Sequence, residues 1–265
     1  MGPSQTQSSQ PALSVVIPVH NEQGNIAPLL DEVAAAVNEM ALAAEIVVVD
    51  DGSSDGTAAA LEDASVRHSI LAVVRHRHNR GQSAALLSGV QAANGPWIAT
   101  LDGDGQNNPA DLPKLWDAVT GDGDPRGLMV VGHRRTRRDT WVRRVSSRIA
   151  NAVRGGLLSD GTPDTGCGLK VFERDVFLGL PHFDHFHRFL PALMQRAGGR
   201  VRSVEIGHRP RQSGASHYGV GNRLWVGLED LAGVLWLGRR AAPWRLDARE
   251  RGNTEVGKEE QQDER

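Results

Sequence analysis

The chain has 265 residues, of which 39% are hydrophobic and 23% charged, so it is long enough for one large globular domain or two small ones. Its net charge of −2 provides no general attraction to nucleic acid, and we expect no nucleic-acid partner. The single cysteine, Cys167, excludes an intramolecular disulfide framework, fits a reducing compartment and is expected to be a small buried residue.

Both ends of the chain are expected to be disordered. Residues 1–11 are polar and lack the apolar core of a signal peptide, and residues 238–265 are charged and show no periodicity. The apolar stretch 224–237 contains two acidic residues and is shorter than the roughly 20 apolar residues that a membrane-spanning helix needs. We therefore expect one domain over 12–237, ending in a short amphipathic helix, in a cytoplasmic protein without a transmembrane helix.

Strands and helices are predicted to alternate along the first hundred residues. Short apolar, β-branched runs indicate buried strands at 12–19, 44–49, 70–74 and 97–101. Helices are predicted at 26–40, after Thr57 to about residue 63, and at 80–93. Strands that are apolar on both faces and separated by helices predict an α/β fold with a mostly parallel central sheet and helices on both faces.

Three polar clusters follow three of these strands. They occupy residues 18–22, 50–57 and 102–106. Ligands of such sheets bind outside the carboxyl ends of the strands, so the three clusters are expected to converge on one edge. The sequence therefore predicts a ligand site there.

The third cluster has the composition of a metal site. Asp102 and Asp104 are two residues apart, so they would point the same way as the strand ends, and Gln106 adds a neutral oxygen. Such hard oxygen donors suit Mg²⁺ or Mn²⁺. The alternative interpretation of this stretch is a solvated Asp-Gly turn.

Two common nucleotide-binding fingerprints are absent. The sequence contains no G-x-G-x-x-G after its first strand and no G-x-x-x-x-G-K-[ST]. Dehydrogenases that use a nicotinamide cofactor and P-loop kinases are therefore disfavoured.

Six motifs, in order, resemble a known family. SVVIPVHNEQGNI, EIVVVDDGSSDGT, NRGQSAALLSGVQAANG, ATLDGDGQNNP, DTGCGLKVFER and HRPRQSGASHYGVGNR are similar to family 2 glycosyltransferases with the GT-A (Rossmann-like) fold. The DxDxQ form resembles the branch that contains dolichol-phosphate mannose synthases and bacterial undecaprenyl-phosphate relatives. The likeness covers roughly residues 13–237.

The resemblance implies that a sugar moves from a nucleoside diphosphate to a polyprenyl phosphate, with inversion at the anomeric carbon. It assigns the nucleotide to Pro18, Glu22, Asp50, Asp51 and Asp102, and the metal-bound diphosphate to Asp102, Asp104 and Gln106. It assigns the acceptor phosphate to Arg134 with Arg144 or Arg148, and closure over the diphosphate to Arg211, Ser216 and His217. Asp104, Asp164 and Arg211 are the expected catalytic residues.

The acceptor of this reaction needs little activation. A phosphate monoester is already ionised at pH 7, so its oxygen is nucleophilic without a strong general base, and Asp164 would orient rather than deprotonate. A metal ion and Arg211 would stabilise the leaving diphosphate. Arginine suits the acceptor phosphate because its guanidinium binds oxygens bidentately.

Contact with a membrane is expected from the arginines of residues 134–154, which would attract an anionic lipid surface. Residues 140–157 could form either an interfacial helix or a helix packed on the core. His217 departs from the family, which usually carries lysine there, and relatives often carry transmembrane helices after the domain. The family also hints at a homo-oligomer.

Two other functions remain open at this point. A glycosyltransferase of the same fold could act on a polysaccharide or soluble hydroxyl, in which case Asp164 would have to serve as the general base. The chain could also be a non-catalytic module that binds nucleotide sugars.

Overall fold

The computed structural model describes residues 10–134, 164–207, 209, 230–237 and 239–240, and the predicted alternation of strands and helices is confirmed. Its first half runs through β1 (Leu13–Val19), α1 (Ile26–Glu39), β2 (Ala44–Asp50), α2 (Thr57–Arg67), β3 (Leu71–Arg75), α3 (Gln82–Ala92) and β4 (Trp97–Thr100). The second half adds the 3₁₀ turn η1 (Pro109–Asp111), α4 (Leu112–Thr120), β5 (Leu128–Arg134), β6 (Lys170–Glu173), α6 (Arg174–Leu178), the turn η2 (Phe186–Arg188), α7 (Leu190–Arg196) and β7 (Arg200–Ile206).

These strands form one sheet in the order β3-β2-β1-β4-β6-β5-β7. Strand β6 runs antiparallel to both of its neighbours, β4 and β5, and the other described pairs are parallel. The prediction of a mostly parallel sheet is confirmed. Because β6 is reversed, its first residues lie at the same edge as the carboxyl ends of β4 and β5.

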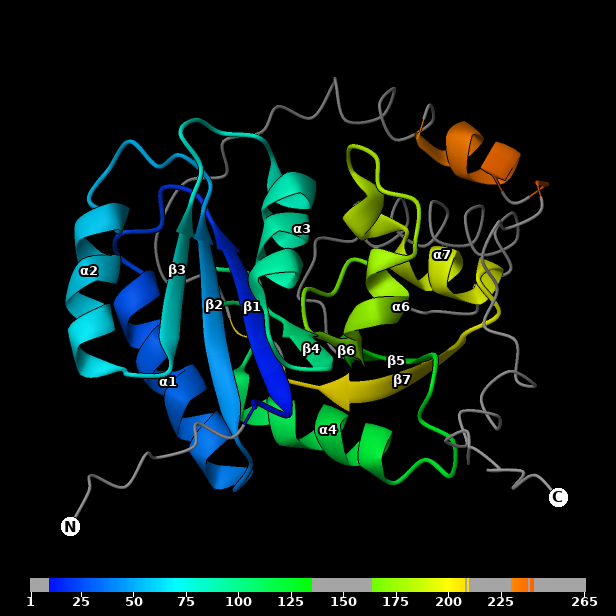
Figure 1. Cartoon of the computed structure of the whole chain (residues 1–265), viewed down its shortest axis with the longest axis horizontal. Coiled ribbons are helices and arrows are strands. Elements are labelled where there is room, and N and C mark those ends of the chain that lie inside the picture. Colours follow the sequence, from blue (N-terminus) through cyan, green and yellow to red (C-terminus); the bar gives the residue numbers. More distant parts are fainter. Residues whose placement is uncertain (1–9, 135–163, 208, 210–229, 238, 241–265) are drawn as a thin grey trace, which may run out of the picture.

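Helices cover both faces of the sheet, as predicted (Figure 1). Helix α1 packs against α2 and α4, whereas α3 packs on β1 and β2 and contacts α6. The central strand shows why the sequence run was apolar throughout. Val15, Val16 and Ile17 have no exposed surface, because each face of β1 is covered.

Residues 230–237 are helical and dock on the rest of the described chain. Val234 is buried, and the Arg196 side chain donates from Nε to the carbonyl oxygen of Leu237 over 2.8 Å. The described part of this apolar stretch therefore packs on the domain. No helix in the described part of the chain combines the length and apolar character needed to cross a bilayer.

Most element boundaries lie within one or two residues of the sequence expectation, and the largest difference is at the end of α2. Helix α2 continues to Arg67, about a turn beyond residue 63, because Leu61 and Ala64 extend its buried face and no helix-breaking residue intervenes. Strand β4 ends at Thr100, one residue early, since the following residues turn into the acidic loop.

Candidate functional site

The loops after β1 and β2 are held together at the carboxyl edge of the sheet. The backbone N–H of Asn21 donates to Ser53 Oγ over 3.0 Å, and its side-chain oxygen accepts from the Ser54 N–H over 2.8 Å. Glu22, predicted to bind nucleotide, donates its backbone N–H to Thr57 Oγ1 over 2.9 Å. The first two polar clusters thus converge as predicted.

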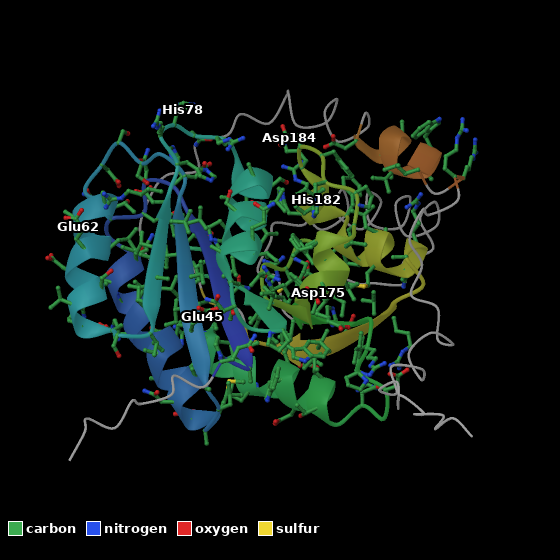
Figure 2. The ribbon with its side chains drawn as sticks, viewed as in Figure 1. Glu45, Glu62, His78, Asp175, His182 and Asp184 are labelled. Carbon is green, nitrogen blue, oxygen red and sulfur yellow. The ribbon has the colours of Figure 1, made fainter. Side chains whose placement is uncertain are left out.

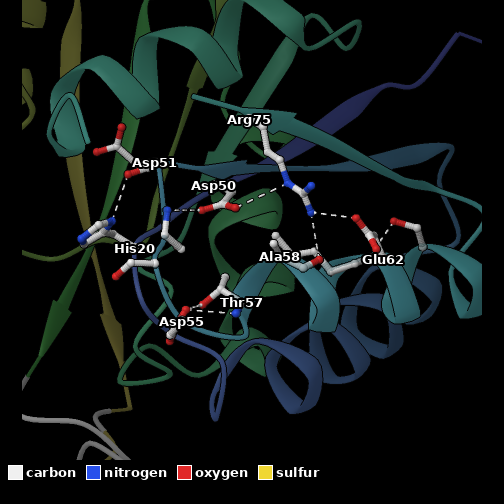
Figure 3. A network of polar contacts seen from close by, with 12 residues as sticks. His20, Asp50, Asp51, Asp55, Thr57, Ala58, Glu62 and Arg75 are labelled. Atoms are coloured by element: carbon white, nitrogen blue, oxygen red, sulfur yellow. Dashed lines mark hydrogen bonds and ion pairs between the residues drawn. The ribbon is translucent and has the colours of Figure 1, made fainter. Parts of the chain in front are cut away.

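Asp50 is the last residue of β2 and is almost fully buried. Its Oδ1 accepts from the Ser53 N–H over 3.0 Å, and its Oδ2 lies 3.6 Å from Arg75 Nε. Arg75 continues to the carbonyl oxygen of Ala58 and to Glu62 on α2, a connection that can be followed in Figure 3. The carboxylate is therefore fixed at the end of β2, where Asp50 pairs with Val19 of β1.

Asp51 has a different role from its neighbour. Its Oδ1 contacts His76 Nδ1 at 2.6 Å and accepts from the Arg80 N–H, while its Oδ2 accepts from the Gly81 N–H over 2.8 Å. The other ring nitrogen of His76 meets Ser88 Oγ on α3 at 2.9 Å. Both carboxylate oxygens are thus used to shape the loop 76–81, from which the exposed His78 points outward (Figure 2).

Asp102 and Asp104 lie beyond the end of β4, in a turn rather than on the strand. Gln82 Nε2 donates to Asp102 Oδ1 over 2.9 Å, and the Gln106 N–H donates to Asp104 Oδ1 over 3.1 Å. Gly105 has a φ of +72°, which favours glycine, so the turn depends on this residue.

Burial and the neighbouring Asp104 carboxylate raise the pKa of Asp102, and Lys170, Arg134 and the bond from Gln82 only partly oppose them. Two carboxylates that repel each other suit a divalent cation. Among the described residues there is no cluster of three or more His, Cys, Asp or Glu side chains that could enclose an ion. The donor set nevertheless fits Mg²⁺ or Mn²⁺, because Mg²⁺ usually takes one or two carboxylates together with substrate phosphates.

The expected acceptor residue Arg134 is paired with Asp164. Arg134 donates from Nε to Asp164 Oδ2 over 2.6 Å and from Nη2 to Oδ1 over 2.9 Å, and both side chains are about nine-tenths buried. The hydrogen bonds to Asp164 raise the pKa of Arg134 above its ordinary value. The structure therefore brings together two residues that lie 30 positions apart in the sequence.

Lys170 is a site residue that sequence reasoning missed. It is 5% exposed and donates from Nζ to the carbonyl oxygen of Cys167. Burial lowers its pKa, while Cys167, Asp102 and Asp164 act in the opposite direction. The available signal was a lysine within the apolar run 169–172, because lysine is rarely buried without a partner.

The segment between α6 and α7 is a packed aromatic region. His182, labelled in Figure 2, has ring centroids 5.3 Å from Phe177 and 5.1 Å from Phe186. His187 Nδ1 meets Ser83 Oγ at 2.8 Å, and burial is the main cause that lowers its pKa to about 3. Cys167 is buried as expected, and burial raises the pKa of its thiol.

Five predicted site residues lie outside the described part of the chain. They are Arg144, Arg148, Arg211, Ser216 and His217.

The chain is similar in sequence to known proteins. Residues 14–179 match the family model described as Glycosyl transferase family 2. A dodecaprenyl-phosphate galacturonate synthase of Rhizobium johnstonii is 32% identical over 87% of the chain and 69% of its own length. An undecaprenyl-phosphate 4-deoxy-4-formamido-L-arabinose transferase of Edwardsiella ictaluri is 36% identical over 78% of the chain and 63% of its own length.

Solved structures share the fold. Glucosyl-3-phosphoglycerate synthase from Mycobacterium tuberculosis, in complex with Mn²⁺, UDP-glucose and phosphoglyceric acid, aligns with a TM-score of 0.63. That alignment covers 86% of this chain and 79% of the other, at 19% identity. A mannosyltransferase from Pyrobaculum calidifontis, in complex with GDP-mannose and Mn²⁺, aligns with a TM-score of 0.56 at 24% identity, over 82% of this chain and 60% of the other.

The predicted GT-A fold is confirmed by these neighbours. The match to the family model covers more than half of the chain, and the sequence relatives extend it. The chain therefore belongs to glycosyl transferase family 2.

Proposed function

We propose that this glycosyltransferase moves a sugar from a nucleoside-diphosphate sugar to the phosphate of a polyprenyl lipid, with inversion at the anomeric carbon. The observation that carries the proposal is that sequence relatives at 32–36% identity are named for dodecaprenyl or undecaprenyl phosphate. The chain spans 69%, 63% and 63% of these three relatives, so the assignment concerns the part they share.

The donor half of the proposed site consists of the clusters after β1, β2 and β4. Pro18, Glu22 and Asp50 would contact the base and ribose, and Asp51 would act by holding the loop that follows β3. Asp102, Asp104 and Gln106 would hold Mg²⁺ or Mn²⁺. When bound, such an ion offsets the charge that develops on the leaving diphosphate.

The acceptor half is proposed around Arg134 and Asp164. Both oxygens of Asp164 accept from Arg134, which suits a residue that orients the guanidinium toward an anion. A phosphate acceptor is already ionised, so the reaction does not require Asp164 as a base. The acceptor phosphate would also be contacted by Arg144 or Arg148. The donor diphosphate would be closed over by Arg211, Ser216 and His217.

The arrangement of Asp164 disfavours a hydroxyl acceptor. A hydroxyl would need a general base to remove its proton, and Asp164 is the expected candidate. A carboxylate whose two oxygens both accept from a buried arginine is poorly placed to take that proton. Because the proposed acceptor is a membrane lipid, contact with the cytoplasmic face of a membrane is part of the proposal.

The first experiment is thermal unfolding of the purified chain with UDP and with GDP, each with and without Mn²⁺. A ligand that binds only the folded state at a hundredfold excess over its Kd stabilises by roughly 2.7 kcal/mol. We expect a metal-dependent shift with one of the two nucleotides and none in Asp104→Ala. The selected donor is then assayed for transfer to undecaprenyl phosphate.

The outcomes separate the three functions. Transfer to undecaprenyl phosphate supports the proposal, and transfer only to a sugar hydroxyl contradicts it. Nucleotide binding without turnover would indicate a binding module. A folded protein that responds to neither nucleotide would exclude the proposed donor site.

A further inference from the structure

Lys170 lies between the two halves of the proposed site. It is the first residue of β6 and pairs with Thr100 on one side and Val131 on the other. Thr100 leads into Asp102, and Val131 leads along β5 to Arg134. The register of the sheet therefore places this lysine where the donor loop and the acceptor arginine meet.

The lysine ammonium is enclosed by charged neighbours. Its side chain is buried, and it interacts electrostatically with Asp102, Asp164 and Arg134. The neighbouring Cys167 thiol has a raised pKa and contributes no charge at pH 7. His187, whose pKa is about 3, is neutral at that pH and adds none either.

Charged side chains of both signs make up this cluster. In the described part of the chain the cluster contains the carboxylates of Asp102, Asp104 and Asp164 and the cations of Arg134 and Lys170. Arg134 is bound to Asp164. The ion would lie on Asp102 and Asp104, so the remaining positive charge of the cluster is that of Lys170.

We propose that Lys170 is a positioning residue that makes the acceptor half of the site select an anionic lipid over its neutral counterpart. This inference rests on the proposed function and adds the group that determines the acceptor class. Lys170 acts through the field at the site, because its Nζ is bound to the Cys167 carbonyl and its side chain is buried. The competing interpretation is a purely structural lysine that only holds that carbonyl.

The experiment compares two lipids that differ only in charge. The affinities of the full chain for undecaprenyl phosphate and for undecaprenol are measured in detergent micelles, with Mn²⁺ and the nucleoside diphosphate that stabilises the protein. The variants are Lys170→Met, Lys170→Gln and Lys170→Arg. Lys114→Met is the matched control, because Lys114 is an exposed lysine on α4 paired with Asp111.

We expect Lys170→Met to lower the preference for the phosphate lipid about tenfold while its undecaprenol affinity stays unchanged, because one buried charge is lost. Lys170→Arg should keep the preference, and Lys114→Met should equal the wild type. Lys170→Gln can still donate to the Cys167 carbonyl but carries no charge, so it should also lose the preference for the phosphate lipid. If Lys170→Met does not fold, Lys170→Gln provides the test.

An unchanged preference in Lys170→Gln, or an equal loss for both lipids, overturns the inference and leaves the proposed function intact. A wild-type protein that binds the two lipids equally overturns the proposed acceptor itself.

Discussion

Gly168 lies directly against the carboxylate of Asp102, so closely that any side chain on Gly168 would collide with it. The carbonyl oxygen of Gly168 also accepts from Thr100 Oγ1 over 2.6 Å, which ties the segment before β6 to the end of β4. The segment just before β6 thus packs against the acidic loop 102–106. A substitution in that segment should therefore alter the donor site.

We predict that Gly168→Ala abolishes the Mn²⁺-dependent part of nucleotide stabilisation. The added methyl group must displace Asp102, and an ion held by two carboxylates would then lose one of them. Thermal unfolding with and without Mn²⁺ measures this. Gly123→Ala is the control, because a β-carbon there meets nothing within 4 Å. A normal metal-dependent shift in Gly168→Ala would show that Asp102 does not bind the ion.

The buried pair of Arg134 and Asp164 gives a second prediction. Removing one partner leaves the other charge buried and unpaired, so Arg134→Met and Asp164→Leu should each lower the free energy of unfolding by about 3–5 kcal/mol. The double variant should recover much of that loss, because no buried charge remains. Urea denaturation of the four proteins measures the coupling. If the stability losses of the two single variants add in the double variant, the two charges are not energetically coupled.

The first four strands and the convergence of their loops could be predicted from the sequence because each signal is local. Buried strands have short apolar runs, and the carboxyl ends of parallel strands share an edge by geometry. Strands β5, β6 and β7 gave no such assignment. The reversal of β6 depends on pairing with β4 and β5, which no local pattern encodes.

The separate roles of the site residues could be assigned only from the structure. Asp50 and Asp51 are adjacent in sequence and look equivalent, yet only the contacts show that Asp51 uses both oxygens to hold the loop 76–81. Lys170 belonged to a recognised motif, but its position between Thr100 of β4 and Val131 of β5 follows from the sheet register. Residue type alone does not carry that information.

Asp51 is therefore predicted to act mainly on stability. Asp51→Ala removes three hydrogen bonds, those with the Arg80 and Gly81 N–H groups and with the His76 ring, and each is worth about 0.5–1.5 kcal/mol. We expect the free energy of unfolding to fall by at least about 2 kcal/mol in urea denaturation. The exposed Asp117, on α4, supplies the control Asp117→Ala. A stability equal to that of the control would contradict the structural role.

His187 gives a prediction about acid stability. Its pKa is about 3 in the folded protein, whereas an unfolded histidine titrates near 6.5, so between these values the unfolded state binds the extra proton. The stabilising contribution of the neutral ring is complete above pH 6.5 and is lost as the pH falls toward 3. In that window it adds a slope of about 1.4 kcal/mol per pH unit to the unfolding free energy.

His187→Gln should remove this part of the slope, because glutamine keeps a hydrogen bond with Ser83 but does not titrate. Urea unfolding between pH 7 and pH 4 measures the difference, and groups such as Asp102 contribute equally to both proteins. The exposed His78, changed to Gln, supplies the matched control. If His187→Gln and the wild type lose stability in parallel, the His187 ring is able to accept its proton in the folded state, and the site beside Lys170 then gains a positive charge at low pH.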